Sequence, residues 1–189
     1  MLDPIVKWSG SKRSQAAEIV ARMPREIDTY YEPFCGGCSV LYRLLHTPTI
    51  KVRKYVASDL NKDLIGLWTM IKYCPDELCK GYTILWNEYN DDIYKDERLY
   101  QRSTSELYTD RKRFFEKVRA RYNKSHSPID FLFIMRTTTN GMPRYNDKGE
   151  FNNSCHFSRP GIHPSRLKEI CDNWSFLLKE NDVEFRSSS

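Results

Sequence analysis

The sequence predicts an α/β fold, with a parallel sheet interrupted by a mostly helical insertion. In the first 73 residues, short apolar runs typical of strands alternate with segments of helical periodicity, which is the pattern of a βαβ unit. From about residue 74 to 128 no strong strand pattern appears. We therefore expect an α/β part at 1–73, a helical part with its loop at 74–163, and a return to the sheet at 164–189.

Strands, turns and helices follow one another in the first part. Pro24 and Pro48 each end a helical pattern, since proline restricts the residue before it. Asn61 can cap the helix that follows the second strand. The expected order is a helix within 13–23, a strand at 30–34, a helix after Gly37, a strand at 55–57 and a helix from Asn61.

The insertion and the C-terminal segment show helical periodicity around one long polar loop. One helix has an apolar face formed by Phe114, Phe115, Val118 and Tyr122. Residues 131–135 are a buried segment, either helix or strand. A loop from 137 to about 163 follows, and Pro164 suits the first turn of another helix. Val183 and Phe185 alternate with polar residues, which predicts a last strand.

Composition and charge narrow the class of protein. No run approaches the roughly 18 apolar residues of a membrane span, and residues 1–8 do not resemble a secretory signal, so we expect a cytoplasmic protein. The net charge is only +5, but residues 111–124 hold seven cations and one anion. This segment is either a footprint for phosphate or a solvated helix face.

Two of the six cysteines, Cys35 and Cys38, have the C-x-x-C spacing of zinc or redox sites. No second pair of this kind exists, and the two cysteines flank a glycine turn. Reduced, structural thiols are therefore the expected state in a cytoplasmic protein.

Three features point to a nucleoside cofactor. A glycine turn, Gly36 and Gly37, joins a strand to a helix and allows close approach of a ligand. Asp59 ends the next strand, where an acid can accept hydrogen bonds from ribose hydroxyls. Trp8 and Lys12 flank a small-residue turn, where they could meet a purine or ribose face and a carboxylate. Singly, these features also fit a tight turn, a helix cap and a core tryptophan.

The same segments resemble the motifs of Dam-type DNA adenine-N6 methyltransferases. Residues 7–12 (KWSGSK) resemble the opening K-W-A-G-G-K, residues 31–39 (YEPFCGGCS) the loop E-P-F-x-G-x-G-S, and residues 57–65 (ASDLNKDLI) the motif D-x-N-x-x-L-I. The resemblance implies a Rossmann-like class I methyltransferase sheet and S-adenosylmethionine. The cofactor-binding residues that it implies are Trp8, Lys12, Phe34, Gly36, Gly37 and Asp59.

The family pattern assigns each of these residues a part of the cofactor. Trp8 and Lys12 would line the methionine end, Phe34 and Gly36 would form the floor, and Asp59 would hold the ribose. One departure stands in the loop itself, because Cys38 occupies the place of the family's second glycine. If that place requires positive φ, Cys38 is strained there.

A second resemblance covers the polar loop. Residues 131–136 and 140–146 resemble F-L-x-L-N-R and N-G-L-x-R-x-N, residues 149–152 match G-E-F-N, and residues 157–161 look like a variant found in phage-type members. In the family this stretch belongs to the target recognition domain, which implies double-stranded DNA as partner. The DNA-binding residues so implied are Arg136, Asn140, Gly141, Met142 and Arg144. Without the resemblance, a polar connector with a few arginines would explain the loop.

The side-chain types in this loop suit base recognition. Arg144 is the candidate base reader, since arginine can bond to guanine O6 and N7. Met142 beside Asn140 could wedge between bases while the target base is flipped. Thr139 stands where relatives often have an aromatic residue. Cations expected to contact phosphate or to be structural are Arg136, Lys148 and Arg159.

The catalytic motif of the family, D-P-P-Y, is absent from the sequence, and no catalytic residue is assigned. Asp3-Pro4 is the only Asp-Pro pair. In relatives the motif follows a strand that residues 184–189 resemble. We therefore expect a truncated, split or complemented methyltransferase, associated with DNA methylation or restriction-modification. The alternatives are a non-catalytic DNA-binding or cofactor-binding fragment of a degenerate methylase, and a methyltransferase for another nucleic acid.

Overall fold

The computed structural model describes residues 4–94, 104–139, 141–156 and 158–187. They form two compact units. Unit 1 comprises Met1–Pro75 and Ile170–Ser189, and unit 2 comprises Asp76–Glu169. The chain returns to unit 1 within a single helix, α7 (Pro164–Glu180).

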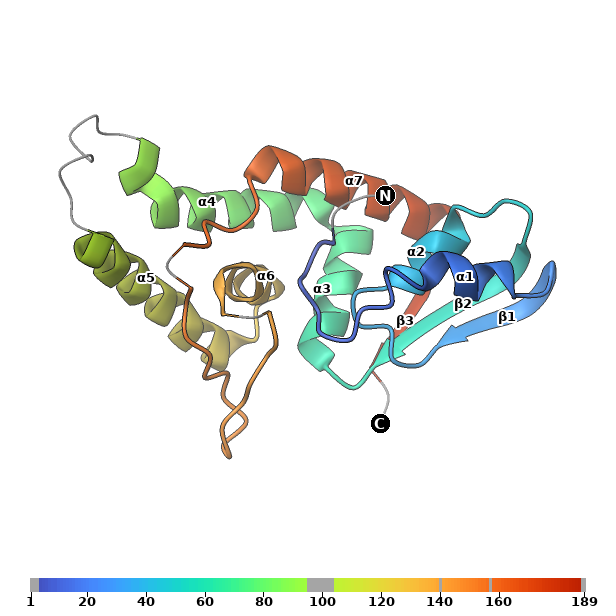
Figure 1. The fold of residues 1–189 in the computed structure, drawn as a ribbon, viewed down its shortest axis with the longest axis horizontal. Coiled ribbons are helices and arrows are strands. Elements are labelled where there is room, and N and C mark those ends of the chain that lie inside the picture. The colour runs from blue at the N-terminus through green and yellow to red at the C-terminus, as the bar shows by residue number, and fades with distance from the viewer. Residues whose placement is uncertain (1–3, 95–103, 140, 157, 188–189) are drawn as a thin grey trace. The chain divides into compact units, whose positions relative to one another are not determined.

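Unit 1 contains a parallel sheet, as the sequence predicts. Its strands are β1 (Glu26–Glu32), β2 (Lys51–Asp59) and β3 (Glu184–Ser187), in that order across the sheet (Figure 1). Both pairs are parallel, so each connection must cross from one end of the sheet to the other through a helical segment. The carboxyl ends of β1 and β2 therefore lie at the same edge of the sheet.

The helices of unit 1 pack through aromatic side chains. They are α1 (Ala16–Ala21), α2 (Ser39–Leu45), α3 (Lys62–Tyr73) and the part of α7 from Ile170 onwards. Trp174 of α7 lies with its ring 4.7 Å from that of Trp68 in α3 and 5.0 Å from that of Tyr42 in α2. Trp68 also stacks on Phe185 of β3 at 5.9 Å. One cluster of rings thus joins three helices to the sheet.

Several local predictions are confirmed in unit 1. The Asn61 side chain caps α3 by accepting a hydrogen bond from the Leu64 N–H at 2.9 Å. Helix α2 ends at Leu45, before Pro48. Both strands begin earlier than predicted, because the first residues of β1 and β2 are mostly exposed and carry few apolar side chains.

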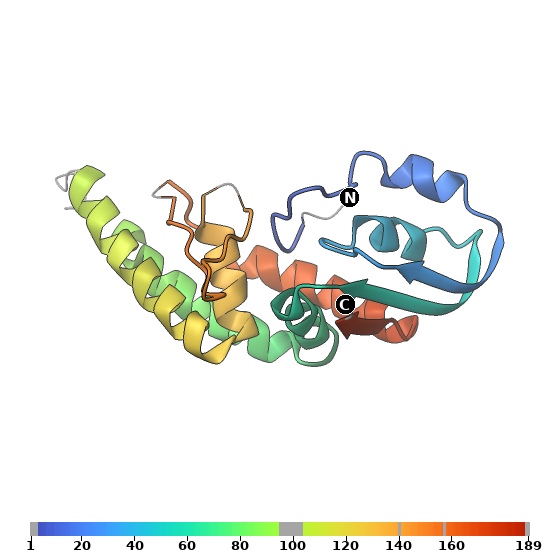
Figure 2. The same cartoon turned by 90° about the horizontal axis from the view of Figure 1, so that it is seen from below.

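Unit 2 is mostly helical, as predicted, and contains α4 (Pro75–Tyr94), α5 (Thr104–Ser125), α6 (Pro128–Thr137) and the start of α7 (Figure 2). The ring of Phe133 in α6 lies 5.3 Å from that of Tyr89 in α4 and 5.7 Å from that of Phe114 in α5. Every residue of helix α6 from Asp130 to its end at Thr137 is buried. That burial explains why the sequence pattern there has no helical face.

After α6 the chain runs out and back as a narrow loop, the orange segment in Figure 1. Two isolated antiparallel bridges pair its arms, Thr138 with Cys155 and Tyr145 with Phe151. At the base of this loop, the Tyr82 hydroxyl of α4 donates to the Ile162 carbonyl and accepts from the Ile162 N–H. The loop is therefore attached to the helices of unit 2 rather than merely connecting them.

None of the helices in the described ranges is long and apolar enough to cross a membrane.

Candidate functional site

The glycine turn follows β1 and is fastened to the end of β2. The Cys35 N–H donates to the Ser58 carbonyl at 2.9 Å, and the Gly36 N–H donates to Oδ2 of Asp59 at 3.0 Å. On the other side of the same residue, the buried Trp68 indole Nε1 donates to the Gly36 carbonyl at 2.9 Å. Both backbone polar groups of Gly36 are thus satisfied within the protein, which fixes the conformation of the turn.

Trp8 covers this turn. A Cβ atom on Gly36 would lie 2.7 Å from Cδ1 of Trp8, and Gly36 has a φ of +46°. Both facts exclude a larger residue there. At Gly37 a Cβ would lie 3.7 Å from Cβ of Trp8, which is ordinary van der Waals contact. The structure therefore brings together two segments, around residues 8 and 36, that the sequence analysis assigned to one site.

Cys38 has the backbone conformation that the sequence analysis considered unfavourable for it. Its φ is +52° and ψ +37°, at the N-cap position of α2, and its side chain is fully buried. Burial, together with the neighbouring Cys35, raises the pKa of the Cys38 thiol well above its usual range. Both cysteines are free thiols. Among the described residues, no cluster of three or more potential metal ligands occurs.

Asp59 joins the glycine turn to the start of α3. Its Oδ2 accepts from the Gly36 N–H, and its Oδ1 accepts from the Asn61 N–H at 3.0 Å. The side chain is only half-buried. Because each carboxylate oxygen has two lone pairs, each can still accept a second hydrogen bond. Asp59 is thus both a structural link and an available acceptor at the carboxyl edge of the sheet.

The turn at residues 7–12 contacts α2. The Ser11 and Ser39 hydroxyl oxygens lie 2.6 Å apart, a hydrogen bond between this turn and the first residue of α2. Nζ of Lys12 donates to the Gly10 carbonyl at 3.0 Å and is exposed. Lys12 therefore stays within its own turn, and its charge is accessible to solvent.

Large apolar side chains are exposed at the same edge of the sheet. Phe34 follows β1 and is 80% exposed, while Leu60 follows β2 and is 63% exposed. They flank the glycine turn and Asp59 in the sequence. Exposed large apolar side chains beside polar acceptors suit the contact of a ring-bearing ligand.

Two side chains that support the glycine turn and the start of α2 were not predicted as site residues, Trp68 and Glu32. Oε2 of Glu32 accepts from the Tyr30 hydroxyl at 2.7 Å and from the Leu41 N–H at 2.9 Å, and burial raises the Glu32 pKa to about 7. For Trp68 the residue type is itself a signal, because a buried indole N–H normally has an acceptor.

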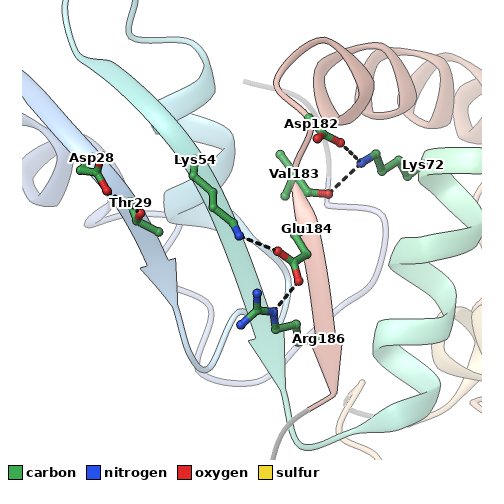
Figure 3. Close-up of polar contacts among 8 residues, drawn as sticks. All are labelled: Asp28, Thr29, Lys54, Lys72, Asp182, Val183, Glu184 and Arg186. Atoms are coloured by element: carbon green, nitrogen blue, oxygen red, sulfur yellow. Dashed lines mark hydrogen bonds and ion pairs between the residues drawn. The ribbon is translucent and has the colours of Figure 1, made fainter.

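A cavity of about 560 Å³ lies beside β3, several residues before Asp59 along β2. Its cations are paired: Nζ of Lys72 donates to Oδ1 of Asp182 and to the Val183 carbonyl, and Lys54 forms an ion pair with Glu184 (Figure 3). No residue predicted to bind cofactor or DNA lines this cavity.

In unit 2 the predicted DNA-binding residues divide into exposed and buried ones. Met142 is 44% exposed and the Arg144 side chain is exposed. Gly141 is buried, with a φ of +62°. Asn140 lies outside the described residues, as does Phe157 of the second resemblance.

Arg136 and Arg159 are placed where they support the loop. The Arg136 side chain is only 8% exposed, within α6. Arg159 Nη1 donates to the Thr138 carbonyl at 2.9 Å. Of the two roles that the sequence left open for them, phosphate contact or structure, their positions favour structure.

The basic run at 111–124 differs from a free basic face. Nη2 of Arg111 donates to the buried Asn90 at 3.0 Å, and Arg121 pairs with the buried Asp130 at 2.6 Å. Further contacts within unit 2 involve Arg113 with Asp110, Lys117 with Glu88, and Arg119 with the Asn153 carbonyl. Five of the seven cations therefore contact other residues of unit 2, although the Arg113 and Lys117 side chains remain 79% and 74% exposed.

The family model for D12 class N6 adenine-specific DNA methyltransferases matches residues 8–188. Type II methyltransferase M.MjaIII of Methanocaldococcus jannaschii is 34% identical over 161 residues, which cover 79% of this chain and 50% of the relative. Type II methyltransferase M1.LlaDCHI of Lactococcus lactis subsp. cremoris is 26% identical over 187 residues, covering 98% and 58%.

The DNA adenine methylase of Escherichia coli K12 is 29% identical over 151 residues, covering 78% of this chain and 45% of the relative. The chain spans about half the length of the curated relatives it matches. Because the family model covers nearly the whole sequence, this chain belongs to the D12 class of N6 adenine-specific DNA methyltransferases.

Proposed function

We propose that residues 1–189 form the cofactor-binding and DNA-reading part of an enzyme that transfers a methyl group from S-adenosylmethionine to adenine N6 in DNA. The observation that carries the proposal is the hydrogen bond between Asp59 and the Gly36 N–H at the carboxyl edge of the parallel sheet. Ligands of open α/β sheets bind at that edge. The sheet would then be the Rossmann-like sheet of a class I methyltransferase.

The residues at this edge fit S-adenosylmethionine in chemical type. Asp59 retains acceptor sites for two ribose hydroxyls, and Phe34 offers an exposed apolar ring. Trp8 and Lys12 would hold the methionine end of the cofactor. The turn of Gly36 and Gly37 would lie beneath it, beside Asp59. When bound, the cofactor supplies a methyl group on a sulfonium. The role of this chain is to orient that group and to exclude water from it.

The exposed part of the loop in unit 2 fits double-stranded DNA. The Arg144 guanidinium is presented to solvent and could bond to guanine O6 and N7. Met142 is an exposed apolar side chain that could fill the space left by a flipped base. Asn140 and Gly141 complete the proposed DNA contacts, and Arg136 would support them from within α6.

Methyl transfer also needs an acceptor for the hydrogens of the adenine amino group, and residues 1–189 contain no D-P-P-Y motif. We propose that this acceptor comes from a further segment or a complementing chain. The same absence favours a second candidate, a fragment that binds DNA or S-adenosylmethionine without catalysis. With DNA and labelled S-adenosylmethionine, the chain alone should incorporate no methyl group. Under the first candidate, incorporation should appear when the complementing part is added. If the complementing part restores no incorporation, the second candidate, a fragment that binds without catalysis, is favoured.

The cofactor site can be tested by calorimetric titration of S-adenosylmethionine into the chain and its variants. Asp59→Ala should weaken binding on the order of tenfold or more, because hydrogen bonds to a charged acceptor contribute about 1.5–3 kcal/mol. Asp28→Ala is the matched control. It removes the same charge from β1, where Asp28 makes an exposed ion pair with Arg53 at 2.6 Å.

Circular dichroism would first establish that both variants fold. A folded Asp59→Ala chain with unchanged affinity would refute the cofactor assignment. Equal losses in the two variants would indicate a general effect of charge rather than a binding site.

A further inference from the structure

The two arms of the loop in unit 2 are joined near residue 144 by a side chain as well as by backbone pairing. The Asn152 N–H donates to the Arg144 carbonyl at 3.0 Å, and the Asn153 side chain adds two further bonds. Oδ1 of Asn153 accepts from the Arg144 N–H at 2.6 Å, and its Nδ2 donates to the Met142 carbonyl at 2.7 Å. Pro143, between them, has no N–H to donate. The side-chain amide of Asn153 thus makes the two bonds that a peptide group of a neighbouring strand would make.

This contact is buried, whereas the side chains that it positions are exposed. Asn153 is only 9% exposed, while Met142 is 44% exposed and the Arg144 side chain points into solvent. A buried amide that loses its partners carries the full penalty of desolvation. The Asn153 amide, together with the backbone bond from the Asn152 N–H to the Arg144 carbonyl, therefore fixes the backbone at residues 142–144 from the less exposed side of the loop.

Asn153 is itself anchored to α5. Nη1 of Arg119 donates to the Asn153 carbonyl at 2.8 Å. One helical turn later, Asn123 accepts from the Phe151 N–H at 2.9 Å and donates to the Phe151 carbonyl at 3.1 Å. The returning arm is thus fixed to a long helix, and Asn153 transmits that position to Met142 and Arg144.

We propose that Asn153 is the positioning residue for base recognition, holding the segment from Met142 to Arg144 in the register in which Arg144 meets a base edge. The inference rests on the proposed function in DNA reading. It assigns Arg119, one of the cations of the basic run, to supporting Asn153 rather than to phosphate. A bidentate contact tolerates little displacement, so loss of the Asn153 amide should cost specificity before it costs affinity.

The test uses the full chain and a pool of DNA duplexes with a randomised centre. The unsubstituted chain should enrich sequences with a preference at the position read by Arg144, and Arg144→Ala should remove that preference. Asn153→Ala should lower the same preference on the order of tenfold. It should leave binding to a random-sequence duplex and its salt dependence unchanged, since Asn153 would touch no phosphate.

Two further measurements separate positioning from general stability. In the protein without DNA, hydrogen–deuterium exchange at the Arg144 amide should accelerate in Asn153→Ala. Asn153→Asp keeps both the volume and the acceptor for that amide but places an oxygen against the Met142 carbonyl. It should protect the Arg144 amide yet still lower the base preference, and it carries the test if the alanine variant does not fold. Asn181→Ala, which removes one local bond at the end of α7, is the control for losing an asparagine.

The failures are distinguishable. If the unsubstituted chain enriches no sequence, the proposed function is refuted and the role of Asn153 in reading falls with it. If the unsubstituted chain has a preference that both Asn153 variants retain in full, the positioning role alone is refuted.

Discussion

At the scale of single residues, Gly36 shows how several demands converge on one position. Its φ is +46°, its N–H is held by Asp59, its carbonyl is held by Trp68, and the Trp8 ring lies where a side chain would begin. The positive φ and the contact with Trp8 each favour glycine, and the two hydrogen bonds each fix the backbone. Together they make the turn a rigid feature whose shape depends on the absence of one methyl group.

We expect Gly36→Ala to lower the free energy of unfolding by at least about 2 kcal/mol, from left-handed backbone strain and from overlap with Trp8. Gly37→Ala is the matched control, because its Cβ would meet Trp8 at an ordinary 3.7 Å. It should change stability by less than about 1 kcal/mol. Urea denaturation of the two variants measures the difference, and equal effects would contradict this account of the turn.

The residue types of the candidate site were predictable from sequence, but their contacts with one another were not. The spacing of Gly36 and Asp59 after successive strands predicts that both lie at one sheet edge, which the parallel pairing confirms. That the Asp59 carboxylate would bond the Gly36 N–H depends on the conformation of the turn. The conformation of the turn depends on Trp8 and Trp68, which are distant from it in the sequence. A local sequence pattern therefore cannot predict this conformation.

At the scale of elements, most helices could be placed because their end signals are local. The Asn61 cap and the stop before Pro48 need only a few neighbouring residues. Helix α6 could not be distinguished from a strand, since burial on all sides removes its periodicity. The bridges of the loop in unit 2 also escaped prediction, because they depend on side chains of α5 such as Asn123.

Glu32 links two elements, since it ends β1 and accepts a hydrogen bond from the first turn of α2 at Leu41. Burial raises its pKa to about 7, although the bonds from Tyr30 and Leu41 act in the opposite direction. The pKa of an unfolded glutamate lies near 4.3. The folded state thus binds this proton more tightly. The resulting stabilisation is complete below about pH 4 and is lost as the pH rises through about 7.

We expect the unsubstituted chain to lose about 1–3 kcal/mol of stability between pH 5 and pH 8 that Glu32→Gln does not lose. Urea denaturation at several pH values measures this difference. Glu26→Gln is the control, because Glu26 begins the same strand and is exposed. The link between β1 and α2 would be contradicted if Glu32→Gln showed the same pH dependence as the unsubstituted chain.

At the scale of the whole molecule, the contacts of each cation indicate its availability for DNA phosphate better than the net charge does. The run at 111–124 concentrates positive charge, but most of its members form ion pairs or hydrogen bonds within unit 2. Sequence could not show this, because the partners, such as Asn90 and Asn153, lie in other segments. Only the three ion pairs offset charge, because Asn90 and the Asn153 carbonyl are neutral. The salt dependence of DNA binding should therefore be lower than seven phosphate contacts would give.

Lys112 and Lys124 of α5 are exposed and make no hydrogen bond or ion pair with the residues that the structure describes. We expect Lys112→Ala and Lys124→Ala each to reduce the slope of log K against log salt by about 1 for binding to a random-sequence duplex, since one phosphate contact contributes about 0.9. Arg22→Ala, which removes one exposed cation from unit 1, should leave the slope unchanged. Fluorescence anisotropy titrations over a range of salt concentrations give the three slopes. If both lysine variants retain the original slope, α5 does not face the phosphates, whereas an equal decrease in Arg22→Ala would mean that total charge decides binding.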